Sequence, residues 1–238
     1  NHQGVMLQGF YWNSFDASHW KNLESQADEL AQYFNLVWIP QSGNCGGESM
    51  GYDDLYWFNN YQSAFGSEQE LRSMIGKLKQ KGIGTIADVV INHRKTLTNW
   101  VDFPKETYQG KTYQLLSTDI CKDDCGGQTA SWAAANGYAL SNNNDTGEGV
   151  TFARDLDHNS ANVQKNVKAY LHFLLNDMGY AGVRYDMVKG YAAKFTALYN
   201  ADAKPTFSVV AESLENKQLP PNWINGTKVN GVIQSAAF

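Results

Sequence analysis

The 238-residue sequence has no run of lysine or arginine, and it has no apolar stretch approaching the roughly twenty residues that span a bilayer. A nucleic-acid-binding surface normally shows as clustered positive charge, whereas this chain carries a formal net charge of −5. We therefore expect no nucleic acid and no membrane among its partners. No charged segment followed by an apolar one opens the chain, so we expect a soluble, mature protein.

Cysteine is scarce, with three residues in the whole chain. Cys121 and Cys125 stand in the polar, turn-rich stretch "CKDDCGG", where a local disulfide is the favoured interpretation. A zinc site there has little support, because no histidine or second cysteine pair lies nearby at ligand spacing. Cys45 is left over, and an odd count says little about the redox compartment.

What the sequence does contain is enough apolar material for one substantial core, since 42% of the residues are hydrophobic and 13% are aromatic. Many of the seven tryptophans and thirteen tyrosines stand beside glycine, asparagine or aspartate. Such placement is typical of surfaces that stack on sugars, although a large α/β core could use the same residues.

Strand-like and helix-like segments alternate along most of the chain. Predicted helices cover 18–34, 67–82, 160–179 and 191–201, and the second of these has Ser67 and Glu70 at the spacing of a capping box. The predicted strands are 5–10, 35–40, 83–93, 182–190, 206–213 and 231–238. This rhythm indicates a parallel sheet.

Two architectures fit six such strands: an open doubly wound sheet, or most of a (β/α)8 TIM barrel. The glycine-rich phosphate-binding motifs of the open sheet, G-x-G-x-x-G and G-x-x-x-x-G-K-[ST], are absent. Polar residues instead follow the carboxyl ends of predicted strands, where barrel active sites are assembled. They are Asn92, His93, Asp186, Lys189 and Glu212. We therefore predict the barrel.

The stretch "GVRYDMVKG" places Arg184 and Asp186 on the same face of a buried strand. They form either a structural ion pair or part of a working cavity, since an unpaired buried charge is costly. Asp186 and Glu212, on successive strands, are the two carboxylates that glycoside hydrolysis needs. Arg184 would keep Asp186 ionised, and the apolar run before Glu212 would raise the pKa of Glu212 and suit it to proton donation.

The strand–helix rhythm stops for about sixty residues, roughly 94–155, in a segment rich in glycine, asparagine and aspartate. A loop of this length is normally functional. Its stretch "NNNDTGEGVTFARDLDHN" is either a solvated acidic loop or a wrap for a hard cation such as Ca²⁺. The carboxylate spacing is not that of an EF-hand.

Six short motifs occur in the order seen in the α-amylase glycoside hydrolase family, and the chain most resembles its plant-like branch. They are "GFYW", "GYDDLY", "DVVINH", "ARDLDH", "GVRYDMVKG" and "VVAES". The resemblance covers essentially the whole chain. It implies a (β/α)8 barrel with an inserted calcium-binding domain after the third strand, over residues 94–155, between barrel segments 1–93 and 156–238.

The resemblance also implies a role for each matching residue. Asp186 corresponds to the catalytic nucleophile and Glu212 to the acid/base. The substrate-binding positions would be Tyr52, His93, Arg184 and Lys189. The calcium ligands would be Asn92, Asp145, Asp155 and the backbone carbonyls of Glu148 and Gly190.

The family's third carboxylate, in a "DNHD"-like motif after strand seven, has no counterpart before Phe238. The resemblance thus implies that the last two strands and the C-terminal β-domain are missing, and that a missing C-terminal part is a partner. We expect the complete enzyme to hydrolyse α-1,4 bonds inside starch and malto-oligosaccharides with retention.

Two alternatives stay open at this point. One is a carbohydrate-binding or assembly fragment without activity, and the other is a relative that transglycosylates or releases products of fixed length. Because starch polymers are met outside cells, we expect a secreted or periplasmic protein.

Overall fold

The computed structural model describes residues 4–210 and 231–233. Within them, parallel strands pair in one sheet in the order in which they occur along the chain. These strands are β1 (Met6–Gln8), β2 (Leu36–Trp38), β3 (Gly84–Val89), β8 (Gly182–Tyr185), β9 (Phe207–Val210) and β10 (Gly231–Ile233). A doubly wound sheet reverses its order at a switch point, and this sheet does not. The predicted partial (β/α)8 barrel is confirmed.

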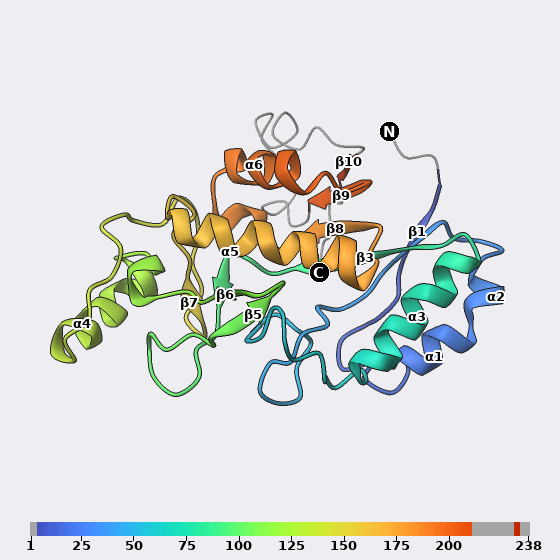
Figure 1. Ribbon diagram of the computed structural model, residues 1–238, viewed down its shortest axis with the longest axis horizontal. Coiled ribbons are helices and arrows are strands. Elements are labelled where there is room, and N and C mark those ends of the chain that lie inside the picture. The colour runs from blue at the N-terminus through green and yellow to red at the C-terminus, as the bar shows by residue number, and fades with distance from the viewer. Residues whose placement is uncertain (1–3, 211–230, 234–238) are drawn as a thin grey trace.

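Helices connect successive strands of the sheet from β1 to β9. They are α1 (Trp20–Ser25), α2 (Ala27–Leu30), α3 (Glu68–Gln80), α5 (Ala161–His172), its π-helical continuation η3 (Phe173–Met178), and α6 (Ala193–Ala203). Helix α1 packs on α3, and α5 packs on α6. Figure 1 shows α1, α2 and α3 together at one end of the molecule, with α5 and α6 running across the sheet.

The first predicted helix, 18–34, is broken into α1 and α2 at Gln26. The Gln26 N–H bonds back to the carbonyls of Leu23 and Glu24, which tightens the chain at this point. The apolar face survives the break, since Leu23 before it and Ala27 after it are both buried. The spacing of apolar residues thus predicted correctly which side chains are buried, but it did not predict the break in the helix.

The prediction that Asn92 and His93 end the third strand is wrong. Strand β3 ends at Val89, and the chain then leaves the barrel sheet. His93 begins β4 (His93–Arg94), which pairs antiparallel with β7 (Arg154–Asp155). The apolar run 89–91 is buried whether or not it is paired in the sheet, so hydrophobicity could not mark the strand's end.

The segment between β3 and β8 has secondary structure of its own. Besides β4 and β7 it contains the hairpin β5 (Glu106–Tyr108) and β6 (Lys111–Tyr113), the 3₁₀ turns η1 (Ser117–Asp119) and η2 (Asp124–Gly127), and helix α4 (Gln128–Ala135). In Figure 1 it extends to the end of the molecule opposite α1–α3. A further 3₁₀ turn, η4 (Val188–Gly190), follows β8.

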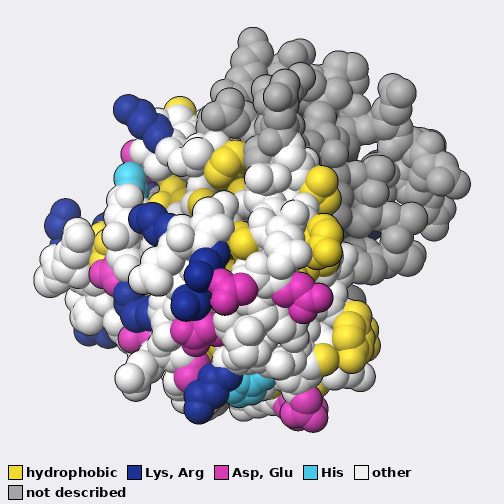
Figure 2. Space-filling view, turned by 90° about the vertical axis from the view of Figure 1, so that its right-hand side faces the viewer, with side chains coloured by type: hydrophobic (Ala, Val, Ile, Leu, Met, Phe, Trp, Pro, Cys, Tyr) yellow, Lys and Arg dark blue, Asp and Glu magenta, His cyan; other side chains and the backbone are white. Residues whose placement is uncertain are grey.

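The core lies between the sheet and its helices, where strand residues from β2, β3 and β8 are buried together. Large aromatic rings fill it: Trp57 stacks on Tyr170 of α5 with 4.8 Å between ring centroids. The face formed by α1 and α3 is polar, and Figure 2 shows basic and acidic side chains interspersed over it. None of the described helices is long and apolar enough to cross a membrane.

Candidate active site and cation site

A cavity of about 510 Å³ opens beyond the carboxyl ends of β1 and β8. The walls come from the segment after β1, the loop around residue 52, the start of β4, the insertion, and the two residues after β8. Its described lining is Gln8, Phe10, Tyr11, Trp12, Tyr52, His93, Val150, Phe152, Asp186 and Met187. Parallel strands deliver their carboxyl ends to one edge of the sheet, which explains why segments so distant in sequence meet here.

Asp186 is the carboxylate of this cavity, and it is held by Arg184. The Arg184 Nη1 atom donates to Asp186 Oδ1 over 2.9 Å, and the aspartate is 4% exposed. The same nitrogen donates to both oxygens of Asp88, at 2.8 and 2.9 Å. The structure thus shows a buried ion pair whose Asp186 also lines the cavity, while Arg184 lies behind it.

The structure makes Asp88, which the sequence analysis did not assign to the site, the second carboxylate partner of Arg184. The register pairs Asp88 of β3 directly with Arg184 of β8. The Trp38 ring lies under the guanidinium at 4.2 Å, and Trp38 Nε1 donates to Asp88 Oδ2 over 3.1 Å. Three adjacent strands thus hold one arginine in place.

Electrostatics keeps this arginine charged. Burial opposes a charge on Arg184, but the neighbouring carboxylates of Asp88 and Asp186 outweigh it and raise its pKa. Burial raises the pKa of Asp88, and Arg184 counteracts this effect. A permanently charged donor bound to an Asp186 oxygen stabilises the carboxylate form, which is the form that a nucleophile needs.

His93 is neutral and fixed at the cavity wall. Its Nε2 lies 2.7 Å from the Tyr52 carbonyl oxygen, so this nitrogen carries the proton and donates it. Burial lowers the pKa of His93. The Asn92 Nδ2 atom lies 3.2 Å from His93 Nδ1, so both ring nitrogens have protein partners and the neutral ring adds no charge to the cavity wall.

Aromatic rings form a rim around the cavity, in which Tyr52 was expected from the sequence and Trp12 and Phe152 were not. Trp12 and Tyr52 stack with 6.2 Å between centroids and 6° between planes. Phe152 of the insertion meets His93 edge-on at 5.2 Å. Trp12 is 68% exposed and Phe152 is 56% exposed, so both rings present surface for a ligand. Aromatic residues beside glycine and asparagine were the available signal, but nothing in the sequence joined residues 12 and 152.

One predicted substrate-binding residue, Lys189, bonds to the side chain of Glu148 at 3.1 Å and is not among the described residues that line the cavity. The predicted acid/base, Glu212, lies outside the described residues.

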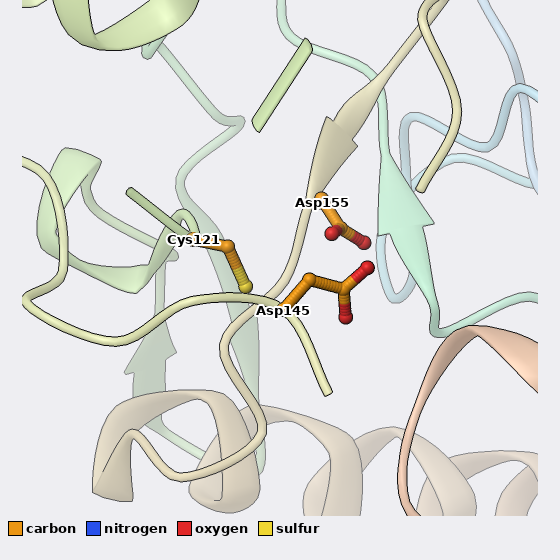
Figure 3. A group of neighbouring side chains, drawn as sticks. All are labelled: Cys121, Asp145 and Asp155. Carbon is orange, nitrogen blue, oxygen red and sulfur yellow. The ribbon is translucent and has the colours of Figure 1, made fainter. Parts of the chain in front are cut away.

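The residues predicted to bind calcium lie near β7, where buried oxygens lack hydrogen-bond partners among the described residues. Figure 3 shows two of these residues, Asp145 and Asp155. Among the described residues, these unsatisfied atoms are Asn92 Oδ1, Asp145 Oδ2 and Asp155 Oδ1. A Cβ placed on Gly190 would collide with Asn92 Oδ1 and lie 2.9 Å from the Glu148 carbonyl oxygen. A Cβ on the neighbouring Gly149 would lie 3.3 Å from Asp155 Oδ2 and 3.7 Å from Asp145 Oδ2, so the five residues of the predicted set lie in one neighbourhood.

The chemistry of this cluster fits a hard cation. Burial and the nearby Asp145 carboxylate raise the pKa of Asp155 to about 10. Two neighbouring carboxylates that each keep a buried oxygen without a hydrogen-bond partner are costly, and a divalent cation removes that cost. Carboxylate, amide and backbone carbonyl oxygens are the ligands that Ca²⁺ prefers.

The favoured Cys121–Cys125 disulfide is not formed, and all three cysteines are free thiols. Cys121 is buried and faces Asp145 and Asp155, whereas the Cys125 thiol is directed at the Thr151 carbonyl oxygen, 4.0 Å away. Short sequence spacing did not bring the two sulfurs together, because the chain turns between them with Cys125 in a left-handed conformation.

Comparison with known proteins gives the chain a family. Residues 47–224 match the family described as "Alpha amylase, catalytic domain". The chain is 31% identical over 207 residues to "Probable alpha-amylase 2" of Arabidopsis thaliana, covering 86% of this chain and 46% of that protein. It is 26% identical over 234 residues to "Glucan 1,4-alpha-maltotetraohydrolase" of Roseateles saccharophilus, covering 92% and 39%.

Solved structures agree on the fold. Alpha-amylase I from Eisenia fetida matches with a TM-score of 0.67 at 14% identity, over 97% of this chain and 48% of that one. A maltohexaose complex of a variant of the same enzyme matches with a TM-score of 0.65 over 96% and 48%, also at 14% identity. The chain spans about half the length of the first relatives it matches. With the family profile matching three quarters of its residues, the chain belongs to the alpha-amylase family.

Proposed function

We propose that the complete protein hydrolyses α-1,4-glucosidic bonds inside starch and related glucans with retention of anomeric configuration. The observation that carries this proposal is the Asp186 carboxylate, bound by a buried arginine at the wall of a cavity that also has exposed aromatic rings. Family membership supports the substrate class.

In this mechanism an Asp186 oxygen attacks the anomeric carbon, and the bond to the leaving oxygen breaks as Glu212 protonates that oxygen. Glu212 then removes a proton from water, and the water oxygen displaces Asp186 from the sugar. Two inversions give net retention. The mechanism requires the two carboxyl groups to lie about 5–5.5 Å apart.

The surrounding residues would bind and orient the sugar. Tyr52 and Trp12 offer a stacked aromatic surface, the neutral His93 ring lines the same cavity, and Arg184 holds the reacting carboxylate in place. We propose that Lys189 binds the leaving-group side of the substrate, and that it exchanges its ion pair with Glu148 for a contact with the sugar.

We further propose that Ca²⁺ binds Asn92, Asp145, Asp155 and the carbonyls of Glu148 and Gly190. When bound, the ion would supply structural charge neutralisation and link the insertion to the segments after β3 and β8. Residues 94–155 would then act as an inserted domain between barrel segments 1–93 and 156–238. Because long glucans are extracellular substrates, we propose a secreted or periplasmic location.

The central test is Asp186→Asn in the complete protein, with turnover measured on a long α-1,4-glucan. We expect turnover to fall by more than about a thousandfold, because an amide cannot serve as the nucleophile. Retention on a starch affinity gel should persist. Asp177→Asn, a surface residue paired with Arg72, is the matched control and should keep full activity. Near-wild-type turnover by the Asp186 variant would refute the proposal.

A second candidate function is release of products of fixed length, which the match to a maltotetraohydrolase favours. Chromatography of early products from a long glucan separates the two candidates. A broad distribution supports internal cleavage, and a single length supports the alternative. An assay of the 238-residue chain alone tests whether it is an inactive carbohydrate-binding fragment.

A further inference from the structure

A thiol borders the cation site. The Cys121 Sγ atom and one carboxylate oxygen each from Asp145 and Asp155 all lie within 4.8 Å of one another (Figure 3). The backbone that carries this sulfur is tied to β7, because the Cys121 N–H donates to the Asp155 carbonyl over 3.0 Å. Asp155 itself is held in β7 by its pairing with His93.

The carboxylates beside the thiol have unused capacity to bind a cation. Asp155 is 2% exposed and its Oδ1 atom has no hydrogen-bond partner among the described residues. The Asp145 Oδ2 atom is likewise buried without a hydrogen-bond partner among the described residues. Buried acceptors of this kind need a donor or a positive ion.

Cations differ in which of these donors they use. Calcium takes oxygen ligands and would draw both aspartates toward Asn92 and Gly190. Zinc and cadmium bind thiolate readily and accept carboxylate oxygens in four-coordinate sites. A sulfur placed at one side of two shared carboxylates therefore offers such ions a different centre from that of calcium.

We propose that Cys121, Asp145 and Asp155 form a site for a thiophilic divalent cation, Zn²⁺ or Cd²⁺, which competes with calcium for the two aspartates. This inference rests on the calcium site of the proposed function. Binding forms a metal–sulfur bond and breaks the S–H bond, and the thiol proton passes to solvent without any change of oxidation state.

Mutual exclusion has a structural consequence. Ligation by Cys121 uses a residue of the insertion alone, whereas Asn92 and Gly190 belong to the segments after β3 and β8. An ion held by the thiol would therefore stop linking the insertion to the barrel. Zn²⁺ or Cd²⁺ bound at this site would therefore weaken the link between the insertion and the barrel without contacting the substrate.

Cadmium is the probe, because a thiolate–Cd²⁺ bond gives a charge-transfer absorption in the ultraviolet. Titration of the calcium-free complete protein should produce this band at one ion per chain, with release of a proton to the buffer. Cys121→Ser should abolish the band. Cys125→Ser, which changes a half-buried thiol four residues away, should leave it unchanged.

Competition is tested by repeating the titration with calcium present. The apparent Kd for Cd²⁺ should rise in proportion to the calcium concentration. Asp145→Asn, which keeps the thiol and changes only a half-buried side chain, should weaken Cd²⁺ at least tenfold. This variant covers the case in which Cys121→Ser does not fold.

A band that persists in Cys121→Ser, or a Cd²⁺ affinity that calcium leaves unchanged, would overturn the proposal. Neither readout uses glucan turnover, so failure here is distinguishable from failure of the Asp186→Asn test. A positive result with an inactive enzyme would likewise leave this inference standing.

Discussion

Gly190 shows at the scale of one residue how the cation site depends on a missing side chain. A Cβ at this position would collide with Asn92 Oδ1 and crowd the Glu148 carbonyl oxygen. We expect Gly190→Ala to lower the free energy of unfolding by about 1–3 kcal/mol and to weaken calcium binding. Urea titration at saturating and at zero calcium measures both effects.

Gly76→Ala is the matched control for this substitution. Gly76 lies inside α3 with open space around its Cα, so alanine meets no obstacle there. Removing glycine from a helix interior should stabilise the protein by about 0.5–1 kcal/mol. Equal stability losses for the two alanine variants would show that Gly190 has no special role.

Residue-scale chemistry was predictable where it depends on local geometry. Strand alternation alone placed Arg184 and Asp186 on one face, and they bond as expected. Asp88 lies 96 residues before Arg184, and its part in the same cluster depends on which residues the β3–β8 register sets side by side. Register between distant strands is a tertiary property.

At the scale of elements, the start of α3 follows from its sequence. Ser67 accepts from the Glu70 N–H and Glu70 accepts from the Ser67 N–H, completing the predicted capping box. We expect Ser67→Ala to lower the free energy of unfolding by about 1 kcal/mol. Ser67→Asp retains an acceptor and should restore most of the loss. Thermal unfolding of the two variants decides this, and equal melting temperatures would contradict it.

The insertion is an element whose support could not be predicted from its sequence. Arg94 and Glu106 form a fully buried pair at 2.8 Å, and Arg94 lies over the Trp57 ring. Glu106 also accepts the backbone N–H groups of residues 57, 58 and 59. The groups that compensate each charge come close only in the folded protein. In the sequence, Arg94 and Glu106 therefore look like two unrelated charged residues in a polar stretch.

At the scale of the whole molecule, calcium should couple the insertion to the barrel. An ion that binds the folded state alone stabilises it by mass action, by about 2.7 kcal/mol at one hundred times the Kd. Excess chelator should therefore lower Tm by several degrees. Asp155→Asn should remove most of this dependence, whereas Glu148→Gln should keep it because its ligand is a backbone carbonyl. A chelator-insensitive melting curve would count against the site.

Acid should destabilise the molecule through His158, which joins the segment after β3 to α6. Its Nε2 donates to the Ile91 carbonyl over 2.8 Å, and its Nδ1 accepts from the Tyr199 hydroxyl over 2.6 Å. Burial lowers the pKa of His158 to about 4. The unfolded chain binds a proton near pH 6.5 and the folded chain does not, so this contribution is complete above pH 6.5 and is lost as pH falls toward 4.

The loss should approach about 3 kcal/mol below pH 4, from the difference between the two pKa values. Urea midpoints at pH 7.5 and 5.0, in excess calcium, measure part of it. His158→Gln should show a smaller pH dependence than the wild-type protein. His172→Gln, at a half-exposed site beside Asp202, should show the wild-type dependence. Parallel pH profiles for all three proteins would exclude His158 as the cause.

The sequence by itself determined the order of strands and helices, the barrel class and the cap of α3, because these depend on side-chain periodicity and local hydrogen bonding. The candidate residues of the cation site followed from the resemblance to the α-amylase family. The tertiary structure alone decided where β3 ends, that Cys121 faces two aspartates instead of Cys125, and that Trp12 and Phe152 line one cavity with Asp186. Those outcomes depend on the packing of segments far apart in the chain, and packing is set by the fold as a whole.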